Sequence, residues 1–378
     1  MSSVEEFRAE IRGWLKTHLS GSFAALKGRG GPGREHEAFA ERLAWERHLA
    51  AHGWTCVGWP EEYGGRGASI EEQIAFHEEY ALADAPARVN HIGEQLLGPT
   101  LIDHGTEEQK ARFLPPIRAV EELWCQGYSE PGAGSDLAAV RTRAALEDGR
   151  WVVNGQKIWT SLAHESQWCF VLARTEPGSR RHAGLSYLLV PLDRPGVEIR
   201  PIVQLTGTSE FNEVFFDGAV TDAANVVGAP GDGWRIAMAT LGYERGVSTL
   251  GQQVGFRREL DALVTLARRN GAAADPAVRD RLTRAWTGLE AMRAAALHGT
   301  DPSAAKLYWS HWHRDLGELA LEVCGPAATL AAGAPYELDD WQRLFLFSRA
   351  DTVYAGSSEI QRNIIAERVL GLPKEPRP

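Results

Sequence analysis

The sequence predicts an α+β protein in three parts: an N-terminal helical domain at 1–120, a middle antiparallel β domain at 121–226 and a C-terminal helical bundle at 227–378. In the first and last parts, apolar side chains recur at helical spacing. Between them, short runs rich in β-branched and aromatic residues alternate with turn signals, and no helix intervenes. The 378 residues suffice for two or three domains with substantial cores.

The first part should begin with a helix, because four apolar residues form one helical face: Val4, Phe7, Ile11 and Leu15. A second helical segment is expected at 35–52, after a loop rich in glycine and proline. Two further helices should start at Ser69 and Thr106. Each of these hydroxyl residues is followed three positions later by a Glu or Gln, which is the pattern of a capping box.

The middle part contains five runs that are typical of strands. They lie at 151–161, 168–175, 184–192, 197–202 and 213–220. Turn signals such as Glu176-Pro-Gly and Asp193-Arg-Pro-Gly separate them. Strands at this spacing favour an antiparallel sheet.

In the last part the helical period returns, in one apolar stripe of Val247, Leu250, Val254, Leu260, Val264 and Ala267. Three more segments have the composition of long helices, at 277–298, 304–323 and 357–371. Several long helices in succession indicate a bundle.

Charge and cysteine content limit the classes of partner. The chain carries 40 Lys+Arg against 50 Asp+Glu, a net charge of −10, so nucleic acid and anionic membranes are poor partners. Its four cysteines lie far apart, which excludes a CxxC pair and favours reduced thiols. No apolar run approaches the ~20 residues that span a membrane, and the N-terminus lacks a signal core. We therefore expect a soluble, cytoplasmic protein.

Three segments have the composition of a ligand site. WCQGYSEPGAGSD at 124–136 is a Gly-rich turn whose backbone N–H groups suit a phosphate or a planar heterocycle. NGQKIWTS at 154–161 offers an indole and two hydroxyls to a flat cofactor, and YAGSSEIQRNIIA at 354–366 begins a helix. Taken singly, they also fit an ordinary tight turn, a core tryptophan and a capped helix. The chain has no GxGxxG or GxxxxGK[ST] motif, which disfavours Rossmann and P-loop sites.

In this order, the segments SEPGAGSD, GQKIWTS and YAGSSEIQRNIIAERVLG resemble those of the acyl-CoA dehydrogenase family, and the resemblance spans essentially the whole chain. It implies an enzyme that binds FAD between the middle domain and the C-terminal bundle. It also implies that two hydrogens are removed from the α and β carbons of an acyl-CoA thioester. The electrons would then pass to an electron-transfer flavoprotein.

The resemblance further implies which residues contact FAD. Those of the middle domain are Gln126, Tyr128, Ser129, Ser135, Trp159 and Ser161. Those of the C-terminal segment are Gly356, Ser357 and Glu359. Within this set, Trp159 should pack beside the flavin ring and Ser161 should offer a hydroxyl near flavin N5. Ser135 matches a position near both the phosphates and the thioester chain, so it is expected to contact the substrate as well.

The reaction requires a base, because a carboxylate must take the α proton while hydride leaves the β carbon. In many family members this base directly follows the Tyr of the C-terminal segment, where this chain has Ala355. In isovaleryl-type and some steroid-thioester members it is a Glu before an Arg, which Glu244 and Arg245 match. We expect Glu244 to be the base, with a pKa raised by desolvation. Arg245 and the backbone N–H of Ala355 are expected to bind the substrate.

Two segments depart from the family where it grips the FAD of an adjacent subunit, at 267–272 and 321–327. They are compatible with a homo- or hetero-oligomer, a dimer or a tetramer, in which a partner supplies contacts. Two alternatives therefore stay open: a half-site or non-catalytic subunit, and a flavin oxidase or monooxygenase of the same fold that acts on a carrier-protein thioester. No metal site is expected, because His311 and His313 alternate on a helix and point apart.

Overall fold

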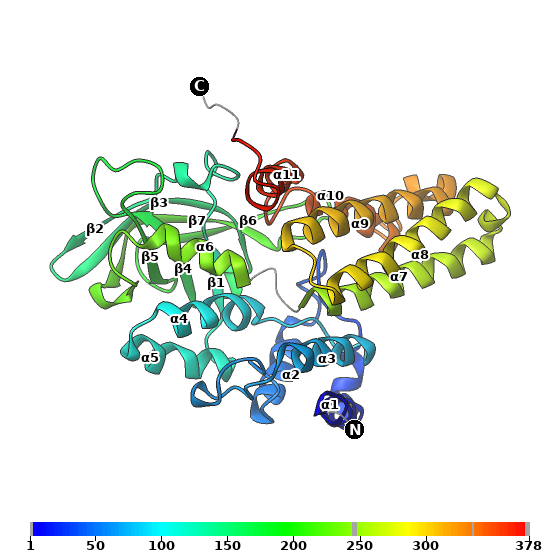
Figure 1. Cartoon of the computed structure of the whole chain (residues 1–378), viewed down its shortest axis with the longest axis horizontal. Coiled ribbons are helices and arrows are strands. Elements are labelled where there is room, and N and C mark those ends of the chain that lie inside the picture. Colours follow the sequence, from blue (N-terminus) through cyan, green and yellow to red (C-terminus); the bar gives the residue numbers. More distant parts are fainter. Residues whose placement is uncertain (1–2, 244–247, 335, 375–378) are drawn as a thin grey trace. The chain divides into compact units, whose positions relative to one another are not determined.

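The computed structural model describes residues 3–243, 248–334 and 336–374. The described chain forms two compact units, and each is considered by itself. The first unit takes its residues from 1–73, 84–204 and 208–244, and the second from 74–83, 205–207 and 245–378. Helices come before and after a mostly antiparallel sheet, as the sequence predicts (Figure 1). Within the described residues, no helix combines the length and the apolar character needed to cross a membrane.

The helices of the first unit are α1 (Ser3–His18), α2 (Phe39–Ala51), α4 (Gly98–His104), α5 (Glu107–Arg118) and α6 (Gly233–Tyr243). Helix α3 (Ile70–Leu82) begins in the first unit and continues in the second. Both predicted capping boxes are confirmed. The Ser69 hydroxyl accepts from the Glu72 N–H at 3.2 Å and the Glu72 carboxylate accepts from the Ser69 N–H at 2.9 Å, while Thr106 and Gln109 exchange the same two bonds.

Helix α2 begins at Phe39 and not at Glu35, where the sequence predicts its start. Ala38 has a left-handed backbone, with φ of 47°, which a continuous helix excludes. The carbonyl of Glu35 accepts from Arg42 Nη1 at 2.7 Å, and its N–H donates to Glu210 at 3.2 Å. These tertiary hydrogen bonds replace the first helical turn.

The sheet has eight strands, in the order β6-β7-β3-β2-β4-β5-β8, with β1 paired to β4. They are β1 (Trp124–Gly127), β2 (Arg143–Glu147), β3 (Arg150–Ser161), β4 (Trp168–Arg174), β5 (Leu185–Pro191), β6 (Val197–Ile202), β7 (Phe211–Asp222) and β8 (Val226–Val227). All pairings are antiparallel except β1 with β4 and β2 with β4. The long pair β3–β7 has a bulge between Lys157 and Thr160.

The sheet is buried on both faces around β4. Phe170 and Leu172 belong to a core shared with α4, α5 and α6, which lie beside the sheet in Figure 1. The alternate residues Cys169 and Val171 belong to a second core with side chains of β3, β5 and β7. This explains why β4 has a nearly continuous apolar sequence.

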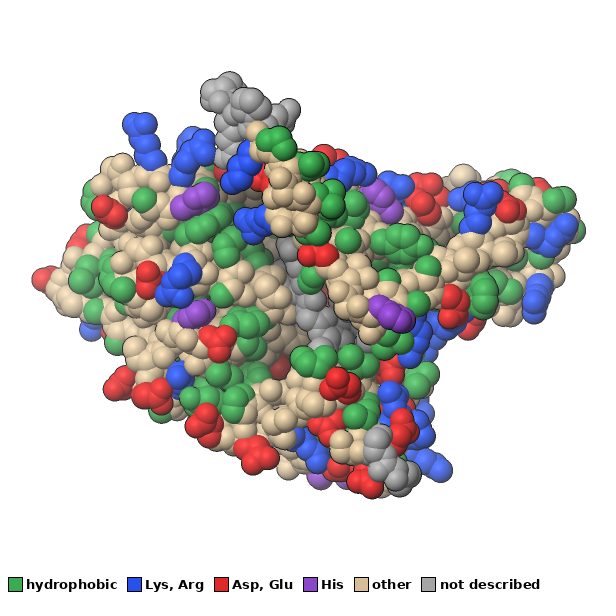
Figure 2. All heavy atoms as spheres, viewed as in Figure 1, with side chains coloured by type: hydrophobic (Ala, Val, Ile, Leu, Met, Phe, Trp, Pro, Cys, Tyr) green, Lys and Arg blue, Asp and Glu red, His purple; other side chains and the backbone are tan. Residues whose placement is uncertain are grey.

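The second unit is built on the long helices α7 (Ser248–Asn270), α8 (Pro276–Leu297) and α9 (Pro302–Cys324), with the shorter α10 (Asp340–Asp351) and α11 (Ser358–Ile364). Apolar side chains from α7, α8 and α9 form one core, as expected for a bundle. On the face shown in Figure 2, basic and acidic side chains are interspersed over these helices. Helix α8 carries the ion pair of Arg284 with Asp280 at 2.7 Å.

Candidate functional site

The two middle-domain motifs lie side by side in the first unit. The N–H of Ile158, on β3, donates to the carbonyl of Ser129, just after β1, at 3.0 Å. The Lys157 ammonium donates to the carbonyl of Tyr128 at 3.0 Å. Residues almost thirty positions apart are therefore joined by two hydrogen bonds, one of them from a charged donor.

Lys157 is fully buried and forms an ion pair with Glu130 at 2.9 Å. Its ammonium also donates to the carbonyl of Leu172 at 2.8 Å, so all three of its protons are used. The Glu130 carboxylate accepts from the N–H groups of Arg141 and Thr142, at 2.6 and 2.8 Å. Burial tends to raise the pKa of Glu130, but Lys157 and these hydrogen bonds outweigh it and hold the pKa below its usual value. The ionised pair fixes the Gly-rich turn to the sheet.

Trp159 has an unusual conformation for a tryptophan in a strand. It lies in the β3–β7 bulge with a φ of 60°, and its side chain is 56% exposed. Its ring lies edge-on to that of Phe211, at 6.3 Å between centroids. Bulges frequently redirect a side chain next to a functional site. The core interpretation of this residue is therefore wrong, and its indole face is free to stack on a planar ligand.

Gln126 offers a hydrogen-bond donor. Its Nε2 is buried, and within the described residues it has no hydrogen-bond partner. A buried donor without a partner costs free energy unless a ligand or water accepts from it. Together with the exposed indole of Trp159, this donor gives the segment a stacking surface and a polar contact, which suit a planar ligand with a polar edge.

The other predicted residues of the first unit differ in exposure. Tyr128 is 5% exposed, and its ring packs edge-on against Phe170 and Tyr187 in the core. Ser129 and Ser161 are half-buried, and Ser135 is exposed in the Gly-rich turn.

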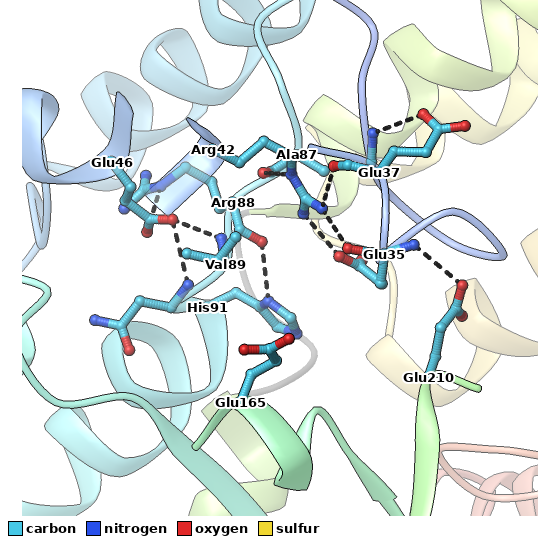
Figure 3. Close-up of polar contacts among 12 residues, drawn as sticks. Glu35, Glu37, Arg42, Glu46, Ala87, Arg88, Val89, His91, Glu165 and Glu210 are labelled. Atoms are coloured by element: carbon cyan, nitrogen blue, oxygen red, sulfur yellow. Dashed lines mark hydrogen bonds and ion pairs between the residues drawn. The ribbon is translucent and has the colours of Figure 1, made fainter. Parts of the chain in front are cut away.

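Glu210 directly precedes β7 and lies beside the end of β3. It connects the sheet to the loop before α2 (Figure 3). Its buried carboxylate accepts from the N–H groups of Gly33 and Glu35, at 3.0 and 3.2 Å. Burial raises the pKa of Glu210, although these two N–H groups oppose the shift. A small cavity of about 100 Å³ adjoins it, lined by Glu35, His36, Phe39, Leu162, His164, Glu165, Ser209 and Glu210. The two hydrogen bonds to Glu210 thus anchor the loop before α2 at the cavity. Leu162, which lines this cavity, directly follows Ser161.

In the second unit, the segment after α10 makes a tight turn before α11. Ala355 and Gly356 both have left-handed backbones, with φ of 51° and 85°. The buried Gln361 holds the turn by donating from Nε2 to the carbonyl of Ala355 at 2.8 Å. Within the described residues, the N–H of Ala355 donates to no backbone acceptor. A backbone donor held in a fixed turn is suited to a substrate carbonyl.

The remaining predicted residues of this segment form the start of α11. The Ser357 hydroxyl caps the helix by accepting from the N–H of Ile360 at 3.4 Å. Glu359 is exposed, and the backbone N–H at the helix start and the Ser357 hydroxyl lower its pKa. Glu244 and Arg245 lie outside the described residues.

Sequence reasoning missed two residues that organise this site, Lys157 and Gln361. Both residues lie inside the predicted ligand segments, but the segments alone do not indicate that these two side chains hold the backbone in place. No local signal marks Lys157, because most of its neighbours in NGQKIWTS are polar or glycine and a lysine among them is equally compatible with an exposed position.

Three domain families match the chain in order. They are the acyl-CoA dehydrogenase N-terminal domain at 2–121, the middle domain at 125–219 and the C-terminal domain at 231–370. The chain is also similar to acyl-CoA dehydrogenase IpdE1 of Mycobacterium tuberculosis (strain ATCC 25618 / H37Rv). The two are 69% identical over 385 residues, which cover 99% of each chain.

Two solved structures are similar over 99% of both chains at 30% identity. One is the Tcur3481-Tcur3483 steroid ACAD, with a TM-score of 0.84. The other is the ChsE4-ChsE5 complex from Mycobacterium tuberculosis, with a TM-score of 0.82.

Proposed function

The chain belongs to the acyl-CoA dehydrogenase family of flavoprotein oxidoreductases, and from this we propose that it uses FAD to dehydrogenate the α and β carbons of an acyl-CoA thioester. The observation that carries the proposal is the junction of the two middle-domain motifs. At this junction, hydrogen bonds from Ile158 and Lys157 keep the exposed indole of Trp159 close in the fold to the Gly-rich turn.

The chain's own residues fit the cofactor that the family implies. FAD supplies the acceptor for the β hydride. Gln126 Nε2 is a buried donor available to the polar edge of a flavin, and the Trp159 ring offers a stacking face. Ser129 and Ser161 add hydroxyls from the adjoining strand ends, and Ser135 adds one from the turn. From the C-terminal segment we assign Gly356, Ser357 and Glu359 to the same cofactor.

We assign the catalytic base to Glu244. A methyl side chain cannot accept a proton, so Ala355 cannot replace the carboxylate that many family members have at its position. The backbone N–H of Ala355 can still hold the thioester carbonyl, because Gln361 fixes the turn that presents it. Polarising that carbonyl acidifies the α proton, and one such donor contributes roughly 3–4 kcal/mol in other enzymes. We place Arg245, the next residue, beside the substrate.

We propose that the acyl group is bulky or branched. The position of the base resembles that of isovaleryl-type and steroid-thioester members, and one similar solved structure is a steroid ACAD. The electrons would leave to an electron-transfer flavoprotein, as in the family.

The second candidate is a subunit that completes its FAD site with a different partner chain. Residues 321–327, which depart from the family's cofactor grip, form the end of α9 and the short turn Gly325–Thr329. Both similar solved structures are named as pairs, Tcur3481-Tcur3483 and ChsE4-ChsE5. A hetero-oligomer is therefore the assembly that we favour.

The test is anaerobic reduction of the bound flavin by short-chain, branched and steroid-like acyl-CoA thioesters. We expect bleaching with the bulky thioesters, and Glu244→Gln should slow it about 100-fold or more at unchanged flavin content, since general bases contribute roughly 10²–10⁴-fold. The control is Glu147→Gln, an exposed carboxylate at the end of β2, which should behave as wild type.

The other outcomes separate the alternatives. Unimpaired bleaching by Glu244→Gln would remove that residue from the mechanism. A lone chain without flavin that gains it on co-expression with a second family member would support the half-site assembly. Oxygen consumption without an added acceptor would favour the oxidase or monooxygenase.

A further inference from the structure

Three histidines converge at the C-terminal ends of α1 and α2, within the first unit. His18 ends α1, while His48 lies in the last turn of α2 and His52 directly follows that helix. Each offers one ring nitrogen, and the three nitrogens lie within 4.8 Å of one another. His18 Nδ1 and His48 Nε2 are 2.9 Å apart.

We propose that His18, His48 and His52 bind a transition-metal ion of the Zn²⁺ class. Imidazole nitrogen suits Zn²⁺, Cu²⁺ and Ni²⁺, while Ca²⁺ and Mg²⁺ prefer oxygen ligands. His48 and His52 stand at i and i+4, the spacing that puts two histidines on one face of a helix around a zinc ion. His18 adds the third ligand from another helix, and a fourth position stays open to solvent.

The hydrogen bonding of His52 prepares it as a ligand. Its Nδ1 lies 2.8 Å from the carbonyl oxygen of His48. A carbonyl can only accept, so Nδ1 carries the proton and Nε2 presents its lone pair. Most histidine ligands of metals donate their other N–H to a carbonyl or carboxylate in this way.

Two of the three rings are affected by burial. Burial, followed by the nearby His52, lowers the pKa of both His18 and His48. Neutral imidazole is the form that binds a metal. Trp14 stacks on His18 at 4.4 Å between centroids and restricts its orientation.

The geometry requires little adjustment. Two nitrogens on one tetrahedral zinc ion stand roughly 3.3 Å apart, given Zn–N distances of about 2.0–2.1 Å. The His18–His48 pair is already near this value, and the exposed His52 ring needs to move by roughly 1–2 Å. The ion would then join α1 to α2.

The experiment is calorimetric titration of Zn²⁺ into the full chain without a histidine tag. We expect one ion per chain, with affinity lowered roughly 100-fold or more by His52→Gln or His18→Gln, because even loss of an outer-shell partner costs about 10–100-fold. The matched control is His298→Gln. His298 is also exposed, with its Nδ1 2.7 Å from the carbonyl oxygen of Ala294, four residues back, but it belongs to no histidine cluster in the described chain.

Cobalt gives a second readout, which does not depend on whether a variant folds. Stoichiometric Co²⁺ should give the wild-type chain a visible d–d absorption band typical of tetrahedral nitrogen ligation, and Zn²⁺ should displace it. Absence of this band, or Zn²⁺ affinity unchanged in His52→Gln or in His18→Gln, would overturn the site. Weaker Zn²⁺ binding by His298→Gln would also count against it.

Discussion

At the scale of single residues, Lys157 joins three segments of the middle domain. A fully buried ammonium is tolerated only when its charge is paired and its protons are all donated. Glu130 supplies the charge, and the carbonyls of Tyr128 and Leu172 accept the other two hydrogen bonds. One side chain thus connects the Gly-rich turn, the bulged strand β3 and the central strand β4.

Replacing Lys157 with methionine should therefore both destabilise the protein and weaken cofactor binding. Removing one partner of a buried ion pair costs about 3–5 kcal/mol, because the other charge is left uncompensated. Urea unfolding should show a loss of this size, and the purified chain should retain less flavin than wild type. Lys16→Met, an exposed lysine of α1, is the control. Adding Glu130→Gln should restore part of the stability, and a double variant no more stable than Lys157→Met would contradict this account.

The sequence predicts the residue types of the site better than their exposure. Local composition identifies Trp159 as a candidate, but the bulge that exposes its indole depends on the register between β3 and β7. That register is set by turns and partner strands, not by the motif itself. Likewise, nothing local distinguishes Tyr128, whose ring is in the core, from its half-buried neighbour Ser129.

At the scale of elements, three helices of the bundle meet at one imidazole. His313 on α9 pairs through Nδ1 with Asp351 of α10 at 2.5 Å and through Nε2 with Glu259 of α7 at 3.0 Å. Asp351 also accepts from the Tyr354 hydroxyl at 2.6 Å, next to the turn at Ala355. The network therefore links bundle packing to the segment that we assign to substrate and cofactor.

This network predicts a pH-dependent stability. Burial opposes charging of the ring, but Glu259 and Asp351 outweigh it and raise the pKa of His313 to about 10. A group whose pKa is higher in the native state than in the unfolded state contributes its full stabilisation below the unfolded pKa, which is about 6.5 for histidine. This contribution to the stability of the fold is lost as the pH rises through the native pKa. We expect the free energy of unfolding to fall by on the order of 4 kcal/mol between pH 7 and pH values above about 10.

The measurement is urea unfolding of wild type and of His313→Gln at several pH values from about 6 to about 10.5. The variant should be less stable at pH 7 and should lose much less stability across this range. His298→Gln, at the exposed residue that directly follows α8, should keep the wild-type slope. Equal slopes in wild type and His313→Gln would show that the imidazole does not titrate as described.

Helix boundaries were predictable where the signal is local. The capping boxes at Ser69 and Thr106 place two helix starts correctly, because a cap is formed within four residues. The start of α2 was not predictable, since its first turn is replaced by contacts with Arg42 and Glu210. The histidine cluster was not predictable for a similar reason, because it depends on the packing of two helices. His18 comes from α1, and His48 comes from α2.

At the scale of the whole molecule, the fold class follows from periodicity, but whether its parts unfold together is a separate question. The sequence divides the chain into helical, β and helical parts, and most of the first two, without 74–83 and 205–207, lies together with α6 in one compact unit. Their shared core explains this. Leu101 and Phe113 of the helical part pack in the same cluster as Trp124, Phe170 and Leu189 of the sheet.

The cysteines can test whether these two parts unfold together. Cys56 lies in the helical part, and Cys125 and Cys169 lie in the sheet. All three side chains are at most 1% exposed. Cys324, in the second unit, is only partly buried, and burial together with Asp339 raises its pKa. A maleimide should therefore label Cys324 slowly in the native protein and should reach the other three only on unfolding.

We expect Cys56, Cys125 and Cys169 to become reactive in a single step when labelling is pulsed across a urea gradient and mapped by mass spectrometry. The physical reason is that Cys56 packs in the core that the sheet shares with α4, α5 and α6, so the helical part cannot open without exposing the sheet. Cys324→Ser should abolish the native-state labelling and leave that step unchanged. Labelling of Cys56 at lower urea than Cys125 and Cys169 would mean that the N-terminal helices form an independent domain, as the division at residue 120 predicts.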